Sequence, residues 1–385
     1  MNFELNETQK NLQKTMAAFC QTEILPDAAT LDESPKDQAM AALRTNLKKL
    51  GNAGYLSLLL ENDLISQGVA GEEVARACPA TFLSAMSTAT AFGVPLNRFG
   101  LTAQRGKYLS GVAKGEFIGC LACTEMDAGS DLNGIKTTAE KKGDHWVLNG
   151  SKYLVTNASI ADVLLALTWT DRSAGLDKGL TFFIVEKGAK GLALGKPMET
   201  MGLRGAPVSE ITFDGCEVNS NAVLGGETGR GYEQYLQIME YVKLAISTLS
   251  VGLGMACMEE STRYAKSRKA FGKPIGLFES VGAKLAMMFT YNDLGRMMVS
   301  RAAWAMEQKD PESVVLTSCA KLFTSEAANE IADLAMQVQG GHGYLKGTMV
   351  ERLYRDARFA VIAYGTSEMQ RAVIAKDSLD RFKSA

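Results

Sequence analysis

Histidine is scarce in this sequence. Only His145 and His342 occur among 385 residues. Zinc sites and Ser-His-Asp triads usually require histidine, so the presence of only two histidines, far apart in the sequence, argues against both kinds of site. The seven cysteines are scattered and odd in number, and Cys120 and Cys123 form a C-x-x-C pair without a second one. We expect reduced thiols rather than disulfides, and no metal site.

The sequence also lacks a strong excess of charge and a long apolar run. Its 41 basic and 43 acidic residues give a formal net charge of −2, which favours neither nucleic acid nor an anionic membrane as a partner. The first residues show no basic segment followed by an apolar one, which a secretion signal would have. No apolar run reaches the roughly 18 residues of a membrane span. We therefore expect a cytoplasmic protein that acts without nucleic acid or membrane.

The sequence does contain enough apolar residues for a large core. The chain has 385 residues, 46% of them hydrophobic, which is too long for one compact domain, so we expect two or three domains. Residues 1–118 have apolar side chains at three-to-four spacing, which is typical of helices. Residues 119–225 have short β-branched and aromatic runs separated by Gly, Asn and Asp, and "LNGSK" (148–152) is interpreted as a hairpin turn. Residues 226–385 return to helical spacing, so the sequence predicts an α+β fold with the order α, β, α.

The region of residues 226–385 is predicted to contain one unusually long helix. No proline occurs between Pro207 and Pro274, and apolar side chains from Leu236 to Cys257 fall at helical spacing. The pattern predicts a helix of about 35 residues, roughly 50 Å long. Further helices are expected over residues 280–308, 312–338 and 367–381.

Four polar motifs stand out, although each has a structural explanation when taken alone. They are "TEMDAGSD" (124–131), "GSKYLVTNA" (150–158), "RKAFGKPIGLFES" (268–280) and "QVQGGHGY...ERLYRDAR...YGTSEMQR" (337–371). The hydroxyl and N–H groups of the first are suited to a heterocycle or a phosphate, and Arg268 is suited to a diphosphate. The second offers Thr156 and Asn157 after an apolar strand. Surface loops, a solvated arginine at a helix end and tight glycine turns explain the same residues more simply.

Together and in this order, the four motifs resemble the acyl-CoA dehydrogenase family over nearly the whole chain. The resemblance implies an N-terminal α-helical domain (1–118), a middle β-barrel domain (119–225) and a C-terminal four-helix-bundle-like domain (226–385). It also implies FAD at a subunit interface of a homotetramer built as a dimer of dimers. The implied activity is α,β-dehydrogenation of an acyl thioester, linked to CoA or to an acyl-carrier protein, with electrons passing to an electron-transfer flavoprotein.

The resemblance also implies site residues by position. The flavin would contact the first strand and loop, the second motif and the last one, at Leu121, Cys123, Thr124, Ser130, Leu154, Thr156, Thr366 and Glu368. The adenosine diphosphate part would be held by a neighbouring subunit, at Arg268, Phe271, Gln337 and Gly341. The substrate would contact Ser130, Glu240, Val242 and Lys243. Leu154 replaces a common tryptophan, and Lys243 replaces a common arginine.

The catalytic base is the position where the sequence departs from the family. Members use a glutamate directly before the Gly-Thr of "YGTSE", and here that residue is Tyr364, followed by Gly365. A second position used in the family falls on Val242. Glu240 lies about 200° around the helix from Val242 and cannot replace that base without distortion. Tyrosine has an ordinary pKa of about 10, which is too high for an efficient base at neutral pH.

Three hypotheses follow. In the favoured one, the intact flavin positions support dehydrogenation with a displaced base: another carboxylate, Tyr364 or the substrate itself. In the second, the same site performs elimination, desulfination, reduction of an enoyl group or oxygenation. In the third, the chain is a subunit without a base that supports an active relative or only binds acyl-CoA. Tyr364 then either takes part through its hydroxyl or backbone N–H, or simply fills the space of the lost glutamate.

Overall fold

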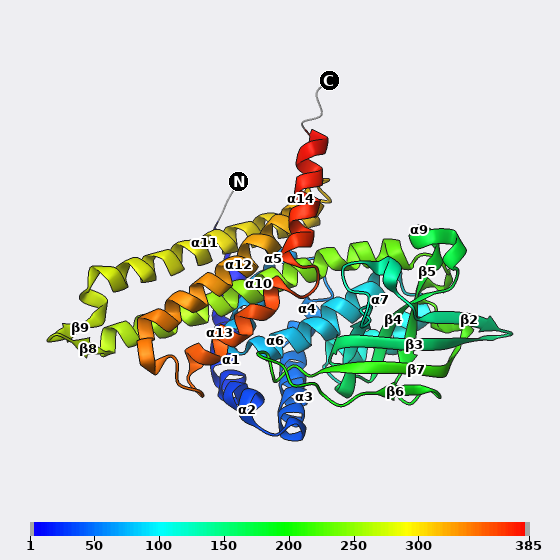
Figure 1. Ribbon diagram of the computed structural model, residues 1–385, viewed down its shortest axis with the longest axis horizontal. Helices are drawn as coiled ribbons and strands as arrows, with labels where there is room; N and C mark the ends of the chain where they lie inside the picture. The colour runs from blue at the N-terminus through cyan, green and yellow to red at the C-terminus, as the bar shows by residue number, and fades with distance from the viewer. Residues whose placement is uncertain (1–3, 382–385) are drawn as a thin grey trace.

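A computed structural model of the chain describes residues 4–381. Helices form the N-terminal region, strands the middle region and long helices the C-terminal region (Figure 1). The strands of the middle region gather at one end of the molecule and the C-terminal helices extend to the opposite end, with the N-terminal helices Ala28–Glu33 and Lys36–Asn52 below them (Figure 1). The predicted α+β fold with the order α, β, α is therefore confirmed.

The N-terminal region is a set of short helices around one apolar core. α1 starts with a reciprocal cap, in which the Asn6 side chain accepts from the Gln9 N–H and the Gln9 side chain accepts from the Asn6 N–H. Leu43, Leu47 and Leu50 are fully buried on one face of α3. The elements are α1 (Glu7–Glu23), α2 (Ala28–Glu33), α3 (Lys36–Asn52), α4 (Tyr55–Leu58), α5 (Leu64–Ala77), α6 (Pro79–Met86), a π-helix (Ser87–Gly93), α7 (Val94–Phe99) and α8 (Thr102–Ala113).

The middle region is a seven-stranded sheet with the order β1-β4-β2-β3-β7-β6, and β5 pairs with β4. The prediction of a hairpin turn at residues 148–152 is wrong, because this stretch lies inside β3. A register shift between Leu148 and Gly150 (φ +136°) absorbs the glycine, and the chain turns at Gly143 instead. The elements are β1 (Gly119–Ala122), β2 (Thr138–Lys142), β3 (His145–Thr156), β4 (Val163–Trp169), α9 (Gly175–Gly179), β5 (Leu180–Glu186), β6 (Leu192–Leu194) and β7 (Val208–Asn219).

The predicted long helix is confirmed as α10, which has 37 residues and a length of about 55 Å. By length and composition it is apolar enough to cross a membrane, contrary to the expectation from the sequence, but 78% of its most apolar stretch is buried inside the structure. α13 was not predicted. The elements are α10 (Gly231–Ser267), β8 (Lys269–Ala270), β9 (Lys273–Pro274), α11 (Glu279–Glu307), α12 (Ser313–Gln339), α13 (Met349–Ala357) and α14 (Ser367–Arg381).

A buried ionic network joins the three regions. Arg355 of α13 pairs with Asp32 of the N-terminal region at 2.6 Å and with Glu351 at 2.6 Å. The neighbouring Asp356 accepts a hydrogen bond from the N–H of Leu203, in the loop between β6 and β7, at 2.5 Å. Leu203 has φ +51°, so this loop is held in a conformation that a leucine rarely adopts. The "RDA" part of the fourth motif is therefore a structural connection between regions.

Candidate functional site

Two of the predicted motifs lie side by side and form one surface of the site, which we call the wall (residues 121–124 and 153–156). The N–H of Tyr153 in β3 donates to the carbonyl of Thr124 at 2.8 Å, which places the end of β1 beside the end of β3. Leu154 has φ +55° and its side chain is 55% exposed, whereas Thr156 is buried. The structure therefore brings Leu121, Cys123 and Thr124 together with Leu154 and Thr156, as the resemblance implied. Ser130 lies farther along the first loop and is exposed.

A buried ion pair supports this wall, and sequence reasoning missed it. Lys152 Nζ lies 2.8 Å from Glu125 Oε1 and donates to the carbonyl of Cys123 at 3.1 Å. Glu125 also accepts from the N–H groups of Lys136 and Thr137. Burial alone would raise the pKa of Glu125, but the charge of Lys152 and these hydrogen bonds bring that pKa below its usual value. The available signal was a lysine at an inward-facing strand position, since Trp146, Leu148 and Lys152 share one face.

Tyr364 closes the wall from the C-terminal region. A 3₁₀ turn (Arg358–Val361) leads into it, its φ is +53°, and its side chain packs inward against the buried apolar cluster that contains Val242. Its ring contacts Phe359 edge-to-face, with centroids 6.4 Å apart. The hydroxyl group is buried although the residue as a whole is partly exposed, and burial raises the pKa of Tyr364 to about 12. Hydrogen bonding with Thr156 of β3 and Ser87 of the π-helix opposes this rise, so the hydroxyl lies where all three regions meet.

The substrate positions predicted on α10 separate onto two faces. Val242 is fully buried in the apolar cluster against which Leu121 and Tyr364 pack. Glu240 and Lys243 face α12, where they form an ion pair at 2.7 Å. Lys243 also donates to Ser318 Oγ at 3.0 Å, and the hydroxyl of Thr317 donates to Glu240. Glu240 is therefore held by other groups and does not reach the face that carries Val242.

The start of α14 forms a polar cavity of about 260 Å³. Within residues 4–381, Ser367 Oγ is buried there without a hydrogen-bond partner. The N–H of Glu368 and the hydroxyl of Thr366 hold the pKa of Glu368 below its usual value. Helix N-termini favour negative groups such as phosphates, so this end of α14 suits an anion. The lining residues are Glu326, Asn329, Arg358, Val361, Ile362, Thr366, Ser367 and Glu368.

The other predicted cofactor residues gather at the opposite end of the molecule. Arg268 caps the C-terminus of α10, and Phe271 (φ +50°) in the β8–β9 turn is 94% exposed. Gln337 and Gly341 are exposed at the end of α12, and the adjoining His342 stacks on Tyr264 near the end of α10, with ring centroids 5.4 Å apart. Arg268 follows Val242 by 26 residues along α10, which is about 39 Å of helix. One chain therefore does not bring these residues to Thr156 and Tyr364.

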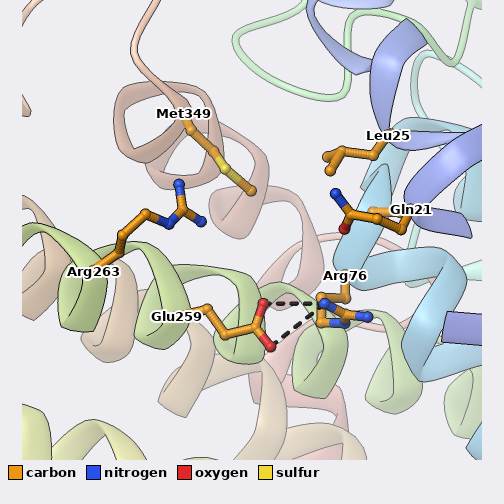
Figure 2. Close-up of a pocket in the computed structure, with 7 residues that line it drawn as sticks. Gln21, Leu25, Arg76, Glu259, Arg263 and Met349 are labelled. Carbon is orange, nitrogen blue, oxygen red and sulfur yellow. Dashed lines mark hydrogen bonds and ion pairs between the residues drawn. The ribbon is translucent and has the colours of Figure 1, made fainter. Parts of the chain in front are cut away.

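A separate cavity of about 380 Å³ lies between α1, α5, α10 and the start of α13 (Figure 2). Arg76 and Glu259 pair across it at 3.1 Å, and Arg263 pairs with Glu260 at 2.5 Å. None of the predicted site residues lines it. Its charged groups largely neutralise one another, so it shows no preference for a charged ligand.

The described part of the chain offers no alternative based on metal or thiol chemistry. Within residues 4–381, no group of three or more His, Cys, Asp or Glu side chains is placed to hold a metal ion. Cys120 and Cys123 are free and buried. Burial raises the pKa of Cys123 to about 12 and raises the pKa of Cys120 as well. Both thiols therefore stay protonated and act as small apolar groups of the wall.

Three family models match consecutive parts of the chain. They describe the N-terminal, middle and C-terminal domains of acyl-CoA dehydrogenases, and match residues 6–116, 120–216 and 229–379. The predicted boundaries at 118/119 and 225/226 fall between α8 and β1 and between β7 and α10.

Individual proteins match over their full lengths. The chain is 35% identical to a probable acyl-CoA dehydrogenase of Bacillus subtilis, covering 98% of this chain and 100% of that protein. It is 33% identical to a 3-(aryl)acrylate reductase of Clostridium sporogenes, covering 97% and 99%. Its fold is similar to that of glutaryl-coenzyme A dehydrogenase in complex with glutaryl-CoA, with a TM-score of 0.93, 29% identity and coverage of 99% and 97%.

Proposed function

The chain belongs to the acyl-CoA dehydrogenase family, and from this premise we propose that it uses FAD to oxidise or reduce the α,β-bond of an acyl thioester. The family consists of flavin-dependent oxidoreductases that act on CH–CH bonds, and the chain is an enzyme of this class. The observation that carries the proposal is the convergence of Thr124, Thr156 and Tyr364 from three separate motifs at one wall. The thioester would be linked to CoA or to an acyl-carrier protein.

The residues present fit FAD. Leu121 and the exposed Leu154 offer an apolar surface for a planar ring, and Thr124 and Thr156 offer hydroxyl groups at its edge. Ser367 Oγ, which has no hydrogen-bond partner among residues 4–381, and the N-terminus of α14 suit the diphosphate. FAD would accept or supply a hydride there.

The distant end of α10 supports a shared site. Arg268 and the 94% exposed Phe271 would reach the diphosphate and adenosine of a cofactor bound to a second copy of the chain. We therefore propose a homotetramer built as a dimer of dimers, acting in the cytoplasm, with an electron-transfer flavoprotein as redox partner.

The direction of the reaction depends on the missing glutamate. Dehydrogenation needs a base at Cα, and the position beside the wall holds Tyr364, while Glu240 is paired with Lys243 on another face. The reduction of an α,β-unsaturated thioester is therefore a second candidate, because a protonated tyrosine suits it. A protein with 33% identity to this chain is named a 3-(aryl)acrylate reductase, which agrees with this candidate.

An anaerobic titration tests the proposed function. The purified protein is mixed with saturated, branched, cyclic and dicarboxylic acyl-CoAs while the flavin absorbance is followed, and the dithionite-reduced protein is mixed with the matching enoyl-CoAs. Bleaching in the first series or recovery of colour in the second supports the proposal. A bound flavin that responds to no thioester in either series contradicts it.

A further inference from the structure

We propose that the Tyr364 hydroxyl is the proton donor to Cα of an α,β-unsaturated acyl thioester, so that the enzyme works as a reductase. The inference rests on the proposed function, because it needs the thioester to bind against the wall formed by β1 and β3. It goes further by assigning the direction of the reaction and the residue that moves the proton.

The first support is the position of the hydroxyl. The inward turn at Tyr364 and its edge-to-face contact with Phe359 fix the ring, since both groups belong to one short segment. The hydroxyl interacts with Thr156, which belongs to the proposed flavin wall, and with Ser87. Ser87 Oγ itself donates to the carbonyl of Thr156 at 3.4 Å. The phenol is therefore directed at the wall by hydroxyl groups from two other regions.

The second support is the environment of the phenol. The ionisable groups that act on it are the buried thiols of Cys120 and Cys123, which are themselves protonated. A phenol whose pKa lies near 12 is almost entirely protonated at neutral pH, so it has a proton to give and almost no capacity to accept one. A residue that only fills space would not need a hydroxyl at this point, because phenylalanine has the same shape.

The proposed step balances without a further group from the chain. When bound and reduced, FAD would supply a hydride, and hence two electrons, for Cβ, which would leave the thioester as its enolate. The O–H bond of Tyr364 then breaks as a C–H bond forms at Cα. The product is the saturated thioester, and the phenolate regains a proton from water. A reductant of the electron-transfer flavoprotein class returns two electrons to the flavin.

Rapid mixing of the reduced holoenzyme with an aliphatic enoyl-CoA tests the inference. Tyr364→Phe keeps the ring and removes the hydroxyl, and we expect it to slow flavin reoxidation by about 100-fold or more. The affinity of the oxidised protein for the saturated acyl-CoA, measured by calorimetry, should stay within about threefold, because a proton donor acts in the transition state. Tyr55→Phe, which removes a buried hydroxyl from the N-terminal core, is the matched control and should react like the wild type.

The outcomes separate the inference from the function beneath it. Slow reoxidation of Tyr364→Phe with unchanged affinity, and deuterium from D₂O found at Cα of the wild-type product, support the inference. Equal rates for Tyr364→Phe and wild type overturn the inference and leave the proposed function standing. A reduced wild-type protein that no enoyl thioester reoxidises overturns the inference, and it overturns the proposed function as well if no saturated thioester bleaches the oxidised flavin.

Discussion

Lys152 Nζ and Glu125 Oε1 lie 2.8 Å apart inside the middle region, with side chains 0% and 7% exposed. This pair fixes the loop after β1, because Lys152 also holds the carbonyl of Cys123 and Glu125 holds the N–H groups of residues 136 and 137. The pair therefore supports the proposed flavin wall and is not part of it.

Breaking the Lys152–Glu125 pair should destabilise the protein strongly. Lys152→Met leaves a buried carboxylate without its cation, and we expect the free energy of unfolding to fall by about 3–5 kcal/mol, measured in urea. Flavin retention should fall with it. Lys136→Met is the matched control, because its pair with Asp127, also at 2.8 Å, is largely exposed and should matter much less. Equal losses for the two variants would contradict the supporting role of Lys152.

Removal of each of the two buried lysines near α12 should change the free energy of unfolding, in opposite directions. Lys243 is paired with Glu240, so Lys243→Met should lower the free energy of unfolding. Lys321 is fully buried and, within residues 4–381, its Nζ has no hydrogen-bond partner. Burial lowers the pKa of Lys321 to about 8, so Lys321→Met should raise the free energy of unfolding at pH 7 by about 3 kcal/mol.

The pH dependence provides the control for Lys321. Its folded-state pKa lies below the unfolded value of 10.5, so the unfolded state binds more protons between pH 8 and pH 10. The wild type should therefore become more stable as the pH rises through this range, relative to Lys321→Met. Parallel stability profiles for the two proteins would show that Lys321 finds a partner in solution.

Asp356 should make the free energy of unfolding fall as the pH rises in the acidic range, which is opposite in sign to the effect of Lys321. Burial raises the pKa of Asp356 to about 6, above its ordinary value of 3.8, so the folded state binds more protons between these two values. The free energy of unfolding should fall by about 2 kcal/mol as the pH rises from 4 to 6. Asp356→Asn keeps an acceptor for the Leu203 N–H and should lack this component in urea unfolding at a series of pH values. A slope that survives in Asp356→Asn would assign it to another carboxyl.

Tyr364→Glu should favour dehydrogenation. The substitution places a carboxylate directly before the Gly-Thr turn, where the family resemblance puts the base. We expect bleaching of the flavin by a saturated acyl thioester to become at least about 100-fold faster than in the wild type. The measurement is anaerobic rapid mixing, with Glu240→Gln as the control, because Glu240 faces α12 and its loss should not prevent the gain. No gain in a folded, flavin-containing Tyr364→Glu would mean that the side chain does not reach Cα.

The sequence was informative where local patterns decide the structure. Helical spacing and the absence of proline predicted α10 closely, because a long run of apolar residues at period 3.6 has few other solutions. The prediction of a turn at Gly150 was wrong, because the pairing of β3 with β7 over twelve residues stabilises an extended strand more than the preference of one glycine for a turn destabilises it. The sequence did not predict α13. At its start the Thr348 side chain accepts a hydrogen bond from the Glu351 N–H, and a single threonine within a glycine-rich motif is a weak signal for a helix.

The candidate site depended on information that a linear sequence does not contain. The motifs named the residues, but the meeting of Tyr364, Thr156 and Ser87 arises from packing between three regions. The ion pair of Lys152 was missed because an inward lysine is recognised only once the strand and its face are known. The separation of Glu240 from Val242 followed from helix geometry alone and agrees with the contacts of Glu240 on α12.

Mixing two inactive variants should show whether the flavin site belongs to two chains. Arg268→Ala damages the exposed end of α10, and Thr366→Ala damages the start of α14, so each variant alone should lose most of its flavin. A mixed dimer has one site with both substitutions and one site with neither. Random pairing makes about half of all dimers mixed, so co-expression should restore about one quarter of the wild-type flavin content. If one chain completed the site, no assortment of the two variants would contain an intact one. Co-expressed variants that fold and assemble but remain without flavin would therefore refute the shared site.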